Sequence, residues 1–207
     1  MLRRRKVTFI AVGTLTVLLA LSVALAVGRG SSQSSTAVPQ NLPGELTGPA
    51  PWPRNVAQLR ARLAALNLPA LAFEGTVLHI HQHLDLFVHG RRVVVPASIG
   101  IDAAGAFISP LHTHDTSGII HVESPTVRRF TLGQFFGVWG VRLGPGRLGG
   151  YADHGNQTLR TFVNGRAVGG DPSGLALAPH QEIVLAFGTP RELPRPIPGS
   201  YPFSDGL

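Results

Sequence analysis

The chain contains no cysteine, and its only methionine is the first residue. It therefore forms no disulfide bond, and soft sulfur coordination of Cu(I) is excluded. Charged residues are also scarce, at 14% of the 207 residues, whereas there are 25 glycines and 17 prolines. This length and composition favour one globular domain with additional segments, rich in turns, β structure and irregular stretches.

Most of the basic charge lies at the N-terminus. The formal net charge is +7, and five of the eighteen basic residues precede residue 30. Residues 31–207 hold thirteen basic and eleven acidic side chains, so this part is nearly neutral. Because a nucleic-acid surface needs a basic excess on the folded part, we do not expect nucleic acid to be a partner.

The N-terminal segment has the pattern of a membrane anchor. Residues 3–6 are all basic, and residues 7–27 carry no charge. A helix of 21 residues spans about 30 Å, close to the thickness of a bilayer core. The sequence therefore predicts a single-pass anchor over residues 1–27, with the N-terminus cytoplasmic and the rest outside the cell membrane. A cleaved signal peptide, which would make the protein secreted, is the alternative.

Histidine is concentrated in one stretch of the chain. Seven of the nine histidines lie between residues 79 and 123. In an extended strand, residues two apart point to the same face. This places His79, His81 and His83 on one face of a strand over residues 76–88, together with Asp85, while the other face is mostly apolar.

A second histidine cluster repeats this spacing. His112 and His114 are two apart, and a strand over residues 119–123 puts His121 and Glu123 on one face. Neutral imidazole is a common metal ligand, and several are needed around one ion. We therefore predict that one pair from the first strand and the pair His112 and His114 bind a shared ion, with His121 as a fifth ligand or a supporting group.

The predicted metal site has only nitrogen and oxygen donors. Its candidate ligands are His79, His81, His83, His112, His114 and His121. Such donors suit Zn(II), Cu(II) and Fe(II), and the general affinity order favours zinc or copper over iron. The remaining histidines, at positions 89, 154 and 180, fall in predicted turns or loops and are not counted as ligands.

Two other functions agree with the same residues. A cupin-like mononuclear metal enzyme would use His112, His114 and His121, with Glu123 as an acid or base. In cupins, however, the first acid lies a few residues after HxH, whereas in this chain Asp115 follows His114 directly. A metal-free, pH-sensitive binding or assembly module would use the protonation of the clustered histidines. No protein partner is indicated by the sequence.

The remaining patterns predict a mostly β (α+β) fold. It consists of a single mixed or antiparallel sheet with one or two short helices, within a domain over residues 54–188 that follows a flexible linker over residues 28–53. The predicted helices are 54–66 and a segment from Thr131, capped with Gln134, to Gly140. Other predicted strands are 91–95, 106–108, 158–163, 166–168 and 182–187, with a glycine-rich loop at 143–155 and an irregular, proline-rich tail at 189–207.

Three motifs carry a resemblance to known proteins. HIHQHLDLFV, LHTHDTSGIIHVESP and FTLGQFF resemble motifs of a group of membrane-anchored bacterial proteins of unassigned function, over residues 78–188. That resemblance implies export and an anchor, but no activity. The order of elements over residues 119–188 is also similar to β-grasp modules, in which a mixed sheet wraps one helix.

Overall fold

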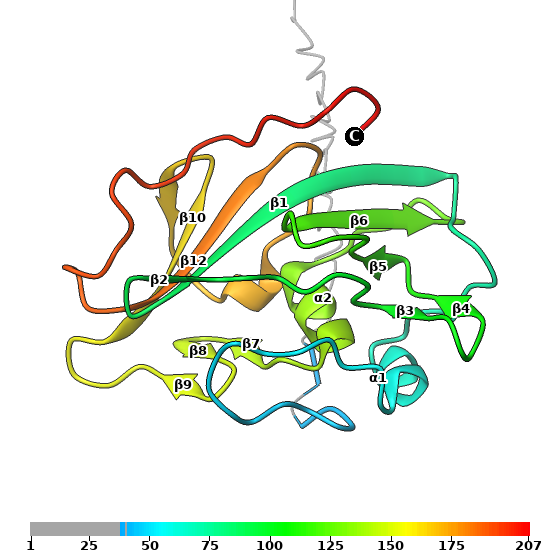
Figure 1. Cartoon of the computed structure of the whole chain (residues 1–207), viewed down its shortest axis with the longest axis horizontal. Helices are drawn as coiled ribbons and strands as arrows, with labels where there is room; N and C mark the ends of the chain where they lie inside the picture. The colour runs from blue at the N-terminus through cyan, green and yellow to red at the C-terminus, as the bar shows by residue number, and fades with distance from the viewer. Residues whose placement is uncertain (1–37, 40) are drawn as a thin grey trace, which may run out of the picture. The chain divides into compact units, whose positions relative to one another are not determined.

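A mixed seven-stranded β-sheet organises the part of the chain that the computed structural model describes, residues 38, 39 and 41–207 (Figure 1). Its order is β11-β10-β12-β1-β6-β5, and β2 also pairs with β1. Only β1 and β12 are paired in parallel. The prediction of a mostly β fold with a mixed sheet is confirmed. The strands are β1 (Leu78–Val88), β2 (Arg91–Val93), β5 (Leu111–His112), β6 (Ile119–Ser124), β10 (Thr158–Val163), β11 (Arg166–Val168) and β12 (Glu182–Gly188).

The predicted membrane anchor lies outside the described residues. Within the described part of the chain, no helix has the length and apolarity that a membrane crossing requires. Leu42 and Trp52, in the second half of the predicted linker, are buried in the hydrophobic core. The folded structure therefore includes residues that precede position 54.

Two tight turns define the hairpins of the main sheet. His89 and Gly90 join β1 to β2 with φ angles of 49° and 75°, and Asn164 and Gly165 join β10 to β11 with φ angles of 50° and 76°. Two-residue turns with both φ values positive match the right-handed twist of paired strands. Both predicted hairpins are confirmed.

Helix α2 (Leu132–Trp139) packs on one face of the main sheet, and all its residues are buried (Figure 1). Thr131 and Gln134 form the predicted capping box, and Gly140 ends the helix with a φ of 84°. Helix α1 (Leu59–Ala65) is shorter than predicted and packs against α2. A short 3-10 helix, η1 (Pro172–Gly174), also lies beside α2.

Two small sheets flank the main one. Strands β3 (Ile101–Asp102) and β4 (Phe107–Ile108) form the first. The second, β7 (Leu143–Gly144), β8 (Arg147–Leu148) and β9 (Tyr151–Ala152), occupies the segment that the sequence predicted to be a loop. That prediction was wrong because strands of two residues between glycine turns are too short to show an alternating pattern.

Arg62 of α1 is fully buried without an acidic partner in a hydrogen bond. Its guanidinium group donates to the carbonyl oxygens of Asn55, Ala57, Val138 and Pro43, at 2.5, 2.6, 3.2 and 3.2 Å. Burial lowers the pKa of Arg62 to about 10. These bonds connect the segments before α1 to the end of α2.

From His81 to Leu86, both faces of β1 are covered, which its alternating sequence did not indicate. Leu84 and Leu86 lie in the core on the side of α2. On the other side, the C-terminal segment over residues 189–207 runs across the sheet without helix or strand, as predicted (Figure 1). The ring of Tyr201 in this segment stacks on His83, with the ring centroids 3.9 Å apart.

The position of β5 depends on Gly100. This residue has a φ of 73°, and a Cβ atom there would collide with the carbonyl oxygen of Leu111, next to His112. We expect Gly100→Ala to lower the free energy of unfolding by about 2 to 4 kcal/mol, from backbone strain and overpacking. Urea unfolding followed by tryptophan fluorescence measures this. Gly144→Ala, where the space is open, is the control, and an equal loss in both variants would contradict the expectation.

Candidate metal centre

The centre of the histidine cluster is strand β6, which lies between β1 and β5. His121 of β6 is paired in register with His81 of β1 and with His112 of β5. One step along the sheet, Glu123 of β6 is in register with His79. Three strands thus bring their histidines to one face of the sheet, the face opposite α2.

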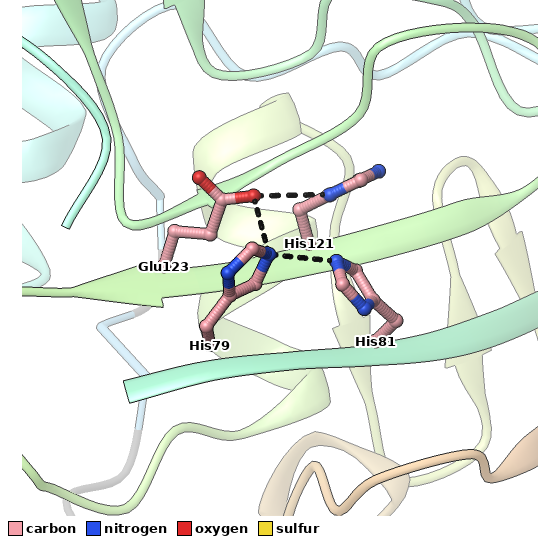
Figure 2. A group of neighbouring side chains, drawn as sticks. All are labelled: His79, His81, His121 and Glu123. Carbon is pink, nitrogen blue, oxygen red and sulfur yellow. Dashed lines mark hydrogen bonds and ion pairs between the residues drawn. The ribbon is translucent and has the colours of Figure 1, made fainter. Parts of the chain in front are cut away.

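Each HxH motif forms a close pair of imidazole rings. The Nε2 atoms of His79 and His81 are 3.1 Å apart, and those of His112 and His114 are 3.2 Å apart. Figure 2 shows the first pair on β1, beside His121. The ring of His121 lies between the two pairs, with centroids 4.5 Å from His81 and 5.3 Å from His112.

One carboxylate oxygen of Glu123 faces both His79 and His121 (Figure 2). Its Oε1 atom is 3.2 Å from Nδ1 of His121 and 3.3 Å from Nε2 of His79. The same oxygen is 3.8 Å from Nε2 of His112. The side chain is 4% exposed, so the carboxylate is held among imidazoles and largely away from water.

The sheet covers one side of the site, and the other side is partly exposed to solvent. His81, His112, His121 and Glu123 are buried. His79 and His114, one from each pair, have side chains that are 51% and 44% exposed. An ion or a small molecule in solution can therefore reach one member of each pair.

Burial makes the inner histidines poor proton acceptors. It lowers the pKa of His81 to about 4, and the pKa values of His112 and His121 to about 3, with further lowering by neighbouring histidines. These three rings are therefore neutral at pH 7, the form that binds metals. In the folded protein these three rings therefore stay unprotonated between pH 5 and 7.

Glu123 shows the opposite shift. Burial, and then the neighbouring carboxylate of Glu74, raise the pKa of Glu123 to about 7. A cation bound at this position would favour the ionised carboxylate.

A hydrogen bond to a backbone carbonyl fixes the orientation of the His112 ring. Its Nδ1–H donates to the carbonyl oxygen of Ser109 at 3.0 Å, which leaves Nε2 with a lone pair directed toward His114. Histidines that bind a metal through one ring nitrogen usually donate the N–H of the other to a carboxylate, a backbone carbonyl or water, which orients the ring.

His83 lies apart from this cluster, although the sequence placed it among the candidate ligands. Its Nε2–H donates to the carbonyl oxygen of Ser117 at 2.9 Å, and its Nδ1 is 2.7 Å from Glu182. His83, Asp85 and Glu182 also lie close enough to one another to form a group of possible ligands. Arg92 is paired with Asp85 at 2.7 Å and both ring nitrogens of His83 have partners, so an ion bound here would displace existing contacts, whereas Oε1 of Glu182 is buried without a hydrogen-bond partner.

The three histidines that were not counted as ligands lie outside the cluster. His89 is in the first hairpin turn, His154 is exposed in a loop, and the ring of His180 hydrogen-bonds to the carbonyl oxygen of Leu207. The sequence did not indicate Glu74, whose carboxylate is 3.4 Å from Nε2 of His114. Only the fold reveals it, because it precedes β1 in an irregular segment.

Apart from the group of His83, Asp85 and Glu182, the candidate ligand atoms form two overlapping groups, in each of which they lie within 4.8 Å of one another. His121 and Glu123 belong to both groups. His79 and His81 complete one, and His112 and His114 complete the other. Neither group contains both HxH pairs, so the geometry differs from the single ion shared by the two pairs that the sequence suggested. Comparison with protein-family models, curated proteins and solved structures gives no match.

Proposed function

We propose that this protein is a transition-metal-binding protein whose metal centre lies on the outer face of the β1-β6-β5 part of the sheet. The observation that carries this proposal is the convergence of two HxH pairs from separate strands on one buried carboxylate. Zinc or copper, more than iron, suits a site made of imidazole nitrogen and carboxylate oxygen.

A metal gives these buried groups a common function. Clustered imidazoles repel one another when protonated, and burying them without partners costs free energy. A cation accepts their lone pairs and neutralises Glu123 at the same time. A purely structural role would be met more simply by apolar side chains at these buried positions.

The proposal includes an extracytoplasmic location. Its support is the sequence pattern of residues 1–27, a basic cluster followed by an uncharged stretch of bilayer length. The metal centre would then take its ion from the space outside the cell membrane, either as an anchored domain or, if the N-terminal segment is cleaved, as a secreted one. A β-grasp-like arrangement, with α2 on one face of the mixed sheet, is part of the same proposal.

Metal content tests the proposed function. We expect the purified full-length chain, kept in mild detergent, to retain zinc or copper after desalting, as measured by elemental analysis. The double variant H81A/H112A, which removes one buried histidine from each HxH pair, should bind zinc or copper at least about 100-fold more weakly and lose it on desalting, since loss of a supporting group alone costs 10- to 100-fold in affinity. His154→Ala, an exposed histidine outside the groups, is the control. Equal metal content in the wild type and the double variant would refute the proposal.

A metal enzyme is the second candidate, and one observation favours it. His112, His114, His121 and Glu123, the set expected for a cupin-like centre, do lie together. Because His114 is partly exposed, a bound ion would keep a position that water or a substrate can occupy. Spectroscopy of the Co(II)-loaded protein distinguishes the candidates: a small anion such as azide changes the spectrum of an open site and leaves a closed one unchanged.

A further inference from the structure

Each HxH pair is spaced for an ion of its own. Two ligand atoms bound to one tetrahedral ion at about 2.0 to 2.1 Å lie about 3.4 Å apart. The Nε2 atoms are 3.1 Å apart in the pair on β1, His79 and His81, and 3.2 Å apart in the pair at β5, His112 and His114. Each pair therefore needs only a small outward rotation of its rings to bind one ion.

The two pairs are separated by a whole strand. Neighbouring strands are about 4.8 Å apart, so the backbones of β1 and β5 are about 10 Å apart across β6. An ion bound by one pair, together with His121 and Glu123, has four ligands and no need of the other pair. A single-ion site would thus leave two converging imidazoles without a role.

Glu123 is placed to serve both pairs. Its Oε1 atom is 3.3 Å from Nε2 of His79 and 3.8 Å from Nε2 of His112. In two-metal sites the ions are about 3.5 to 4 Å apart, and a shared anion between two dications offsets their repulsion. A buried carboxylate on the central strand meets this requirement.

From this geometry we infer a two-ion centre, in which His79 and His81 bind one divalent transition-metal ion, His112 and His114 bind a second, and Glu123 bridges them. His121, which borders both pairs, completes the coordination of one ion. The inference rests on the proposed function and extends it. The exposed rings of His79 and His114 place the open side of both ions toward solvent, where a water or an anionic ligand can contact the two together.

Metal stoichiometry tests the two-ion centre. The full-length chain in detergent is freed of metal with a chelator, titrated with zinc alone, desalted and analysed by native mass spectrometry. We expect two zinc ions per chain in the wild type and one in His79→Ala and in His114→Ala, each of which removes a partly exposed ring that the fold tolerates losing. H79A/H114A should retain no zinc that survives desalting, and His154→Ala should retain two.

The outcomes separate this inference from the proposed function. One zinc in the wild type, weakened by either single variant, would overturn the two-ion centre and leave the metal-binding function intact. No zinc or copper in the wild type would overturn both. Copper provides a second measurement: two Cu(II) ions joined by Glu123 couple magnetically, so the EPR signal of the wild type should account for less copper than elemental analysis finds. In His79→Ala the two values should agree.

Discussion

Glu123→Gln is expected to weaken the binding of both metal ions at once, by at least about 100-fold each. Glutamine keeps the size of the side chain but removes the only negative charge that both HxH pairs contact. Loss of a supporting partner alone costs 10- to 100-fold in metal affinity, and here a charged ligand of both ions is replaced by a neutral amide. Isothermal titration of the metal-free chain with zinc measures the affinities.

The same variant should change the pH dependence of binding. In the wild type a proton must leave Glu123, whose pKa is raised to about 7, before the carboxylate can bind an ion. Glu123 should therefore contribute a rise in zinc affinity of up to about tenfold per pH unit below pH 7 and no further rise above it. The inner histidines add little to this slope, because their pKa values of about 3 to 4 leave them unprotonated throughout this range.

Glu192→Gln is the control for both measurements. Glu192 is also a glutamate beside a histidine, with Oε2 3.7 Å from Nδ1 of His89, and it belongs to none of the groups of possible metal ligands among the described residues. Its substitution should leave zinc affinity and its pH dependence unchanged. If Glu123→Gln binds zinc as tightly as the wild type and with the same pH slope, Glu123 is no ligand in either ion site.

The alternation of residues predicted a large part of the candidate site. A strand period of two places His79 and His81, or His112 and His114, on one face whatever the rest of the fold. The turn residues at positions 89–90 and 164–165 and the capping box at Thr131 predicted their elements because each depends on a few neighbouring residues. Each of these features depends on a few neighbouring residues, so the sequence alone is enough to predict it.

The division of the cluster depends on strand pairing, which is not local. His81, His121 and His112 meet because β6 pairs with both β1 and β5, and nothing in the spacing of the motifs specifies β6 as the central strand. His83 has the same spacing as His81, yet it faces Glu182, 99 residues away, and Tyr201 of the C-terminal segment. Its separation from the cluster follows from the parallel pairing of β1 with β12.

The metal-free protein should lose stability steeply when the pH falls below 6.5. His81, His112 and His121 have folded-state pKa values of about 4, 3 and 3, against an ordinary value of 6.5. Below pH 6.5 the unfolded chain takes up these three protons and the native state does not, so the stability present above pH 6.5 is lost as the pH falls. Each proton is worth about 1.4 kcal/mol per pH unit.

Glu123 acts in the opposite direction. Its folded-state pKa of about 7 exceeds the ordinary 4.5, so between these values the native state binds the extra proton and gains stability as the pH falls. Three histidines against one glutamate leave a net uptake of about two protons on unfolding between pH 6 and 5. The expected loss is about 3 kcal/mol per pH unit, a large share of the 5 to 15 kcal/mol that is typical of folded proteins.

Tryptophan fluorescence in urea measures this loss on the described domain alone, because the chain has two tryptophans and both, Trp52 and Trp139, are buried there. In His121→Gln the chain takes up one proton fewer on unfolding, so the loss of unfolding free energy per pH unit should fall to about half. His154→Gln, at an exposed loop position, should keep the wild-type slope.

Bound zinc should protect the wild type, because the ion competes with protons for the same imidazole lone pairs. A urea midpoint that stays constant from pH 7 to 5 in the metal-free chain would contradict the lowered histidine pKa values, and with them the burial of neutral imidazoles on which the metal centre depends.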